Sequence, residues 1–267
     1  NVAMTHIDAE LAMFSSSYVC VPGFEEYIVA KVNQITEGGI EKFEDTTNNV
    51  FPADSFTQGG GGDDDGHLEQ QSTADLTNNS GFSSDLWDDD QHEEVIVGFH
   101  TIVTAGVCEM VLSHWVTTNE VEDIAFQHAC ISLARRLSVS DFSPTGSDDA
   151  DLELCNFENA IDTMVRLDTL TGLSVFSYMR MMEAIITMVV DATAAVIQDV
   201  TADVCIPLVV FVIVSAAPRR LPSILKFLMD FMIPILEMSS LGYSYTTFEA
   251  GAAQVMEEYI RRVQDKS

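Results

Sequence analysis

The chain of 267 residues carries 42 Asp and Glu but only 12 Lys and Arg, giving a formal net charge of −30. This excess of acid argues against binding to nucleic acid or to anionic lipid, because both are recognised through clusters of Lys and Arg. Since 47% of the residues are hydrophobic, the chain has enough apolar side chains for a core and is not disordered throughout.

Residues 1–43 show two helical patterns of apolar side chains, one on each side of Pro22. Gly38 and Gly39 weaken the second pattern near its end. The apolar positions fall three or four residues apart, as on one face of a helix, and they are Ile7, Leu11 and Phe14, then Tyr27, Ile28, Val32, Ile35 and Phe43. The spacing predicts a helical hairpin that is part of a helical bundle.

Residues 44–85 have the composition of a linker. They contain four consecutive glycines at 59–62 and three aspartates at 63–65, and their few apolar residues follow no period. Such a segment cannot bury enough apolar area to offset the entropy lost on ordering. We therefore expect a disordered acidic linker between the hairpin and residues 86–264.

Residues 86–264 are helical in pattern almost throughout, without the alternation typical of strands. One segment, Leu208–Val214, is rich in β-branched residues and favours a strand by propensity, but a single strand would have no sheet to join. We interpret it as a buried helix and predict an all-α, layered helical bundle. The expected helices cover residues 93–115, 119–137, 153–168, 174–197, 203–216, 221–237 and 247–263.

The cysteines and the apolar runs indicate an intracellular protein that does not span a membrane. The five cysteines are scattered and form no CxxC pair, as expected of reduced thiols. The most apolar run, Val204–Ala216, is shorter than the roughly 20 residues that cross a bilayer. No signal peptide is recognisable, and because the chain begins at Asn1 rather than Met, we expect it to be a piece of a longer protein.

Motifs of metal-dependent and nucleophilic enzymes are missing from the sequence. It contains no HExxH, GxSxG, Walker-type or Rossmann glycine pattern, and its six histidines show no metal-ligand spacing. We therefore expect no cofactor and do not favour a hydrolase or a metal enzyme.

Two short segments in the last quarter combine polar and aromatic residues. Asp203 stands at the start of an apolar helix, where a carboxylate can cap orphan amides. Gly242 suits a turn, Tyr243 suits a half-buried position, and Thr246 or Thr247 can cap the final helix. Local chemistry alone favours these structural roles.

The order and spacing of these segments resemble those of the Vps-nine domain. The likeness is close over 95–262 and loose over 10–95, where Pro22-Gly-Phe-Glu-Glu-Tyr-Ile and Leu86-Trp87 are similar to the helical bundle of Rabex-type members. The segments that carry it are Ala202-Asp203, Pro207, Ala217-Pro218-Arg-Arg-Leu and Gly242-Tyr-x-Tyr-Thr-x-Phe-Glu-Ala.

This resemblance implies a guanine nucleotide exchange factor for an early-endosomal Rab GTPase, without covalent chemistry. Asp203 matches the family's catalytic acid, which enters the phosphate and magnesium site of the GTPase, and Tyr243 matches a tyrosine that contacts the first switch. The resemblance also implies a cytoplasmic protein peripheral to early endosomes that acts in endocytosis and vesicle-mediated transport. The implied partner-binding residues are Pro207, Pro218, Tyr245 and Thr246.

Three positions depart from the family pattern. Ala217 stands where the family usually has Asn, Arg219 stands in place of a second Pro, and Leu241 replaces an acidic residue before Gly-Tyr. These departures leave open an alternative, a helical Rab-binding module with weak or no exchange activity.

Overall fold

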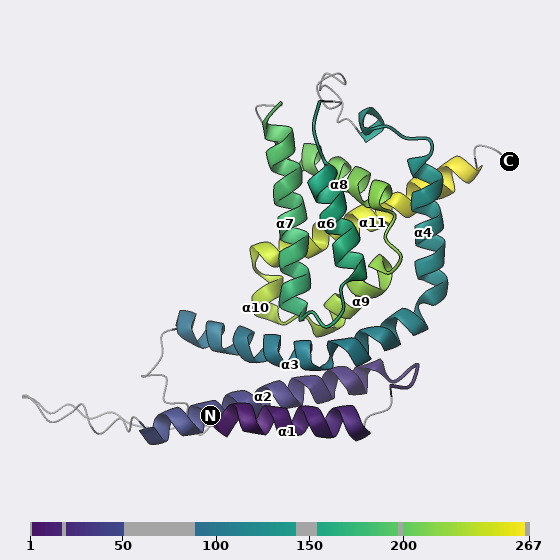
Figure 1. Ribbon diagram of the computed structural model, residues 1–267. Helices are drawn as coiled ribbons and strands as arrows, with labels where there is room; N and C mark the ends of the chain where they lie inside the picture. Colours follow the sequence, from purple (N-terminus) through teal and green to yellow (C-terminus); the bar gives the residue numbers. More distant parts are fainter. Residues whose placement is uncertain (1, 18–19, 51–88, 143–153, 197–199, 265–267) are drawn as a thin grey trace, which may run out of the picture.

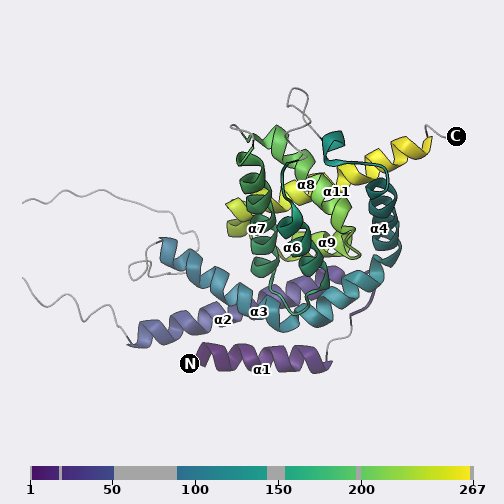
Figure 2. The same cartoon turned by 45° about the horizontal axis from the view of Figure 1, so that its top comes forward.

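The computed structural model describes residues 2–17, 20–50, 89–142, 154–196 and 200–264, and every regular element in these ranges is a helix. The all-α prediction is therefore confirmed. The helices form two layers (Figure 1), and the tilted view of Figure 2 shows α1 as the outermost helix. The lower layer contains α1 (Val2–Ser17), α2 (Glu25–Val50) and α3 (Asp89–Thr118). The upper layer contains α4 (Glu120–Ala134), the short 3-10 helix η2 (Val139–Phe142), α6 (Glu158–Thr169), α7 (Val175–Ala194), α8 (Ala202–Ala216), α9 (Leu221–Phe231), α10 (Pro234–Glu237) and α11 (Ser240–Gln264).

Helices α1 and α2 form the predicted hairpin, but α2 continues through residues 44–50, which the sequence placed in the linker. Gly39 explains why the helix does not end early. A side chain there would collide with Ile7 of α1 and come within 3.2 Å of Phe99 of α3, so the glycine lets three helices approach closely. One turn later, the Phe43 ring packs against Phe99 at 5.6 Å. These tertiary contacts outweigh the low helix propensity of Gly38-Gly39; the rest of the predicted linker, residues 51–85, lies outside the described residues.

Helix α3 is shared by the two layers. One of its faces contacts α1 and α2, and another contacts α7 and α9, where the Trp115 ring lies 5.6 Å from that of Phe231. Within the described ranges, α3 is also the one helix whose length and apolar composition would allow it to cross a membrane. The core helix of a globular protein passes the same test, and α3 lies between two sets of helices (Figure 1).

Helix α8 forms the centre of the upper layer, and the choice of helix over strand for Leu208–Val214 is confirmed. Six of these seven side chains are at most 2% exposed. The seventh, Phe211, packs edge-on against Phe142 and Phe157. Because α4, α6, α7 and α11 all contact α8, it is enclosed on several sides, and each buried aliphatic side chain contributes about 1.5–3 kcal/mol to folding.

The last two predicted helices have other boundaries in the structure. The helix predicted over 221–237 is two helices, since α9 ends at Phe231 and Pro234 begins α10. Proline at that position cannot donate the hydrogen bond that would continue α9. The final helix begins at Ser240 rather than at 247, so Gly242 is helical and not in a turn, and Thr246 and Thr247 are not caps.

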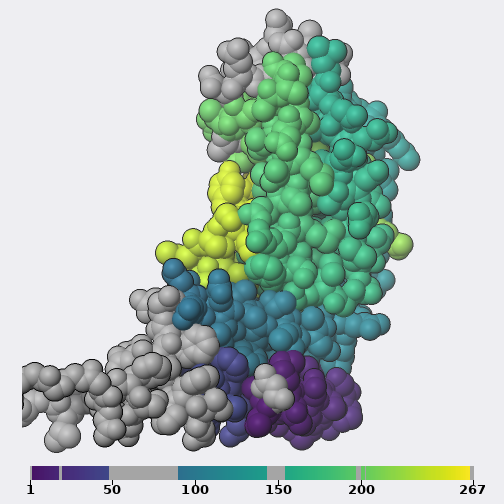
Figure 3. All heavy atoms as spheres, turned by 60° about the vertical axis from the view of Figure 1, so that its left-hand side comes forward, coloured from purple at the N-terminus to yellow at the C-terminus, as the bar shows by residue number. Residues whose placement is uncertain are grey.

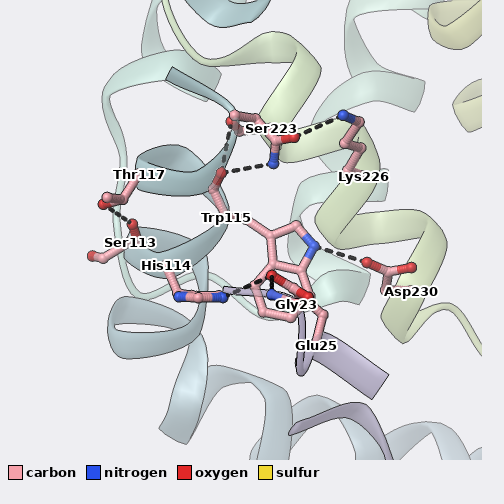
Figure 4. A network of polar contacts seen from close by, with 10 residues as sticks. Gly23, Glu25, Ser113, His114, Trp115, Thr117, Ser223, Lys226 and Asp230 are labelled. Carbon is pink, nitrogen blue, oxygen red and sulfur yellow. Dashed lines mark hydrogen bonds and ion pairs between the residues drawn. The ribbon is translucent and has the colours of Figure 1, made fainter. Parts of the chain in front are cut away.

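A set of polar contacts joins the hairpin to the upper layer through the end of α3 (Figure 4). Glu25 Oε1, at the start of α2, lies 3.0 Å from His114 Nε2. The adjacent Trp115 donates its indole N–H to Asp230 Oδ2 of α9 at 2.8 Å. Ser223 of α9 donates its hydroxyl to Asp123 Oδ2 of α4 at 2.6 Å. Hydrogen bonds between partly buried side chains fix the angle between helices more specifically than apolar contacts do.

We expect Trp115→Phe to lower the free energy of unfolding by about 1–2 kcal/mol, because the partly buried Asp230 carboxylate loses its donor. Chemical denaturation of the wild type and the variant measures the change. In an Asp230→Ala background the same substitution should cost clearly less, and equal costs in the two backgrounds would contradict a role for the hydrogen bond.

The His100 side chain of α3 is fully buried in the core between the two layers. Burial lowers the pKa of His100 below its usual value. The unfolded chain therefore takes up this proton at a higher pH than the folded protein does. Stability is complete above the unfolded pKa of about 6.5 and falls as the pH drops below it. Denaturation between pH 7 and pH 5.5 should show this loss, and His100→Leu should flatten it.

Candidate functional site

Asp203 lies in the first turn of α8, directly after a start that is not capped by a side chain. Thr201 occupies the N-cap position but accepts no hydrogen bond through its hydroxyl. The Asp203 side chain is exposed, and its carboxylate forms no hydrogen bond or ion pair with any residue that the structure describes. The capping role that local chemistry favours is therefore not the one observed. The carboxylate is an unpaired negative charge held near the amino end of a buried helix.

Pro207 lies one turn further along α8 and is partly exposed. Because proline has no amide hydrogen, it cannot donate to the carbonyl of Asp203 four residues earlier, as another residue would in an α-helix. The first turn of α8 thus has one backbone hydrogen bond fewer than a regular α-helix, while the rest of the helix is fixed in the core.

Tyr243 lies in the first turn of α11 and is 51% exposed. Gly242 beside it is buried, and any side chain there would collide with the backbone carbonyl of Glu237 in α10. The exposed Thr246 and the buried Thr247 both donate their hydroxyls to the carbonyl of Tyr243, at 2.9 and 2.8 Å. The close contact with α10 therefore determines where α11 starts and where Tyr243 emerges.

Helices α8 and α11 pack closely along their middle parts. Gly251 of α11 lies against Val210 and Ile213 of α8, where an added side-chain carbon would come within 3.2 Å of Ile213 Cδ1. Both helices begin on the same side of the upper layer (Figure 1), and the view from that side shows the start of α11 below α8 (Figure 3). The packing brings the first turns with Asp203 and Tyr243, together with Pro207 and Thr246, to one side of the domain.

Two residues that the resemblance implied as partner-binding do not share this surface, because Pro218 and Tyr245 are buried. Tyr245 is 4% exposed and donates its hydroxyl to Glu249 Oε1 at 3.3 Å. Burial raises the pKa of Tyr245. Its ring lines a groove of about 360 Å³ between α4, α9 and α11, on another side of α11 from Tyr243. Both residues therefore lie off the exposed surface that carries Tyr243, and their implied part in partner binding stays a prediction.

The three departures from the family pattern have different structural settings. Ala217 ends α8 in the left-handed conformation with φ 45° and ψ 57°. Leu241 is buried in the core, and Arg219 is exposed beside a polar hollow at the α8–α9 loop. Ala217, Arg219 and Leu241 all lie outside the first turn of α8, which carries Asp203. Leu241 lies in the first turn of α11, but its side chain faces the core.

A polar contact next to Tyr243 joins two helices that are far apart in the sequence. Glu183 of α7 accepts a hydrogen bond from the hydroxyl of Ser240, the first residue of α11, at 2.7 Å. The two residues are 57 positions apart, so no local pattern could reveal the pair. Among the described residues, no group of three His, Cys, Asp or Glu side chains could hold a metal ion. The five cysteines are all free.

Residues 169–259 match the family model of the vacuolar sorting protein 9 (VPS9) domain. The matched range includes all of α7, α8, α9 and α10 and most of α11, and therefore contains Asp203 and Tyr243. A comparison with curated proteins found no match.

The conformation of Ala217 leads to a stability prediction. An L-residue with a Cβ is strained in the left-handed region by about 1 kcal/mol, whereas glycine is not. We expect Ala217→Gly to raise the free energy of unfolding by about 0.5–1 kcal/mol in chemical denaturation. The control is Ala216→Gly, one residue earlier and still helical, which should lower it by a similar amount. A loss of stability in Ala217→Gly would refute the assignment of strain.

Proposed function

We propose that this chain, whose residues 169–259 form a VPS9 domain, is a guanine nucleotide exchange factor for a Rab GTPase of the early-endosomal subfamily. VPS9 domains are exchange factors for Rab GTPases, so the class of partner follows from the family. The narrower choice of subfamily rests on the resemblance to Rabex-type members. Exchange makes and breaks no covalent bond, because GDP leaves when the factor binds the nucleotide-free GTPase more tightly than the loaded one.

The observation that supports this function best is the unpaired carboxylate of Asp203 on the first turn of α8. A GTPase holds its nucleotide with loop amides, a lysine and Mg²⁺. A carboxylate that enters this site pairs with the lysine, opposes the binding of Mg²⁺ and repels phosphate. Because Asp203 has no partner among the residues that the structure describes, no interaction seen there has to be broken before it enters the GTPase.

Tyr243, Thr246 and Pro207 complete the proposed contact surface. Tyr243 presents a half-exposed aromatic ring with a hydroxyl, which suits an interface that is partly apolar and partly wet. Thr246 is exposed one turn away on the same helix, and Pro207 flanks Asp203 on α8. We assign these three residues to binding and Asp203 to the displacement of the nucleotide.

The alternative of an inactive Rab-binding module rests on Ala217, Arg219 and Leu241. Two of these residues end α8 or fill the core, and none removes Asp203 or Tyr243 from the surface. We therefore favour an active exchange factor and treat tight binding without exchange as an outcome of the experiment below. A Rab partner of this subfamily would recruit the protein to the cytoplasmic face of early endosomes.

The test is the release of a fluorescent GDP analogue from a purified early-endosomal Rab, with and without the protein. We expect the wild type to accelerate release and Asp203→Ala to lose about 100-fold of that acceleration, the size typical of removing one essential polar group from a reaction site. The free energy of unfolding should change by no more than about 1 kcal/mol, because within the described part of the chain the carboxylate has no hydrogen bond or ion pair and meets the helix dipole alone.

Asp162→Ala is the matched control, since Asp162 is also an exposed aspartate on a helix, α6, of the upper layer. It should retain full activity. Binding of the nucleotide-free Rab by the wild type without faster release would support the inactive module. Failure to bind any early-endosomal Rab would refute the proposed partner.

A further inference from the structure

We propose that Glu183 of α7 and Ser240 of α11 are positioning residues that hold Tyr243 in place for contact with the GTPase. This inference rests on the exchange function proposed above. It extends that function to a pair of residues that do not themselves have to touch the partner.

The geometry joins α7 to the first residue of α11. Ser240 donates its hydroxyl to Glu183 Oε1 at 2.7 Å, and Arg180 donates Nη1–H to Glu183 Oε2, also at 2.7 Å. The Arg180 guanidinium lies 5.3 Å from the centre of the Phe176 ring, one turn earlier on α7. Each carboxylate oxygen of Glu183 thus accepts from one partner. The hydrogen bond from Ser240, followed by that from Arg180, lowers the pKa of Glu183. The carboxylate is ionised at neutral pH.

The first turn of α11 is packed against its surroundings through the buried Leu241 and through Gly242, which lies against the Glu237 carbonyl of α10. Its hydrogen bonds to other elements are few. The backbone amide of Tyr243 donates to the carbonyl of Ser239 at 3.2 Å, and the amide of Leu241 donates to the hydroxyl of Ser239 at 3.1 Å. Both bonds are local. Of the side-chain hydrogen bonds at residues 240–244 that the structure describes, only Ser240–Glu183 reaches another helix.

A helix start is the place where such a tether has most effect. The first four amides of an α-helix have no acceptor inside the helix, so this turn frays unless something outside holds it. A carboxylate near the amino end also interacts favourably with the helix dipole. Because Tyr243 is three residues after Ser240 and its ring is half exposed, the direction of this turn decides the direction of the ring. The hydrogen bond to α7 therefore acts together with the contact of Gly242 on α10 to hold Tyr243 in place before the partner arrives.

The experiment measures GDP release from an early-endosomal Rab at increasing concentrations of the full chain, which separates the maximal rate from the half-saturating concentration. We expect Ser240→Ala and Glu183→Ala each to raise the half-saturating concentration about three- to tenfold, the effect of losing one charge-assisted hydrogen bond. The double variant should be no worse than either single one. Thr187→Ala is the control, because its hydroxyl bonds within α7, to the carbonyl of Glu183, and does not reach α11.

The decisive comparison uses a Tyr243→Ala background. If Ser240 acts through Tyr243, adding Ser240→Ala there changes nothing further. An equal loss in both backgrounds would mean a general structural role and overturn the proposal, as would wild-type exchange parameters in Ser240→Ala.

Amide hydrogen exchange separates a failure of this proposal from a failure of the exchange function. In the free protein, Ser240→Ala should speed exchange at the amides of residues 241–246 and leave α7 and α8 unchanged. If the wild type accelerates release from no Rab, the exchange function fails, and this measurement still decides whether Glu183 and Ser240 hold the turn. Unchanged protection at 241–246 would overturn the positioning role.

Discussion

Helix α8 is apolar on nearly all its faces, and a helix of this kind is stable only when other helices surround it. This requirement organises the upper layer, in which α4, α6, α7 and α11 all pack against α8. It also explains why the candidate site lies where it does. The first turn of α8 is the part that leaves the enclosure, so Asp203 is carried on a rigid support while its carboxylate stays in solvent. When a charged group on a rigid helix binds a partner, the backbone that carries it loses little conformational entropy.

The different sides of helix α11 have different surroundings, because the helix lies at the edge of the domain. One side packs against α7 and α8, and its first turn exposes Tyr243. Another side faces α4 and α9 across an apolar groove lined by Tyr245. Two tyrosines only two residues apart therefore have opposite environments, because successive positions on a helix point about 100° apart. Which of two neighbouring tyrosines can touch a partner is decided by the packing of the helix.

The sequence was sufficient for the fold class, the hairpin and the positions of most helices, because apolar spacing reports which faces are buried. It failed where a tertiary contact overrides local preference. Gly38-Gly39 weakens a helix in isolation, but Gly39 is needed where Ile7 and Phe99 approach. Gly242 resembles a turn residue, but it is a helical glycine pressed against a backbone carbonyl. The pair Glu183–Ser240 and the contacts from Glu25 to Asp230 join residues far apart in sequence, and no spacing rule identifies such partners.

The enclosure of α8 has a consequence for how this domain can be cut. The matched range 169–259 omits α4, η2 and nearly all of α6, although all three cover α8. A fragment limited to that range would lose Phe142 and Phe157, which pack against Phe211, and the uncovered side of α8 would make it prone to aggregate rather than to fold as a domain. The segment that matches the family model is thus shorter than the segment needed to form the folded core. Helix α3, buried from both sides, extends that folding unit into the amino-terminal hairpin as well.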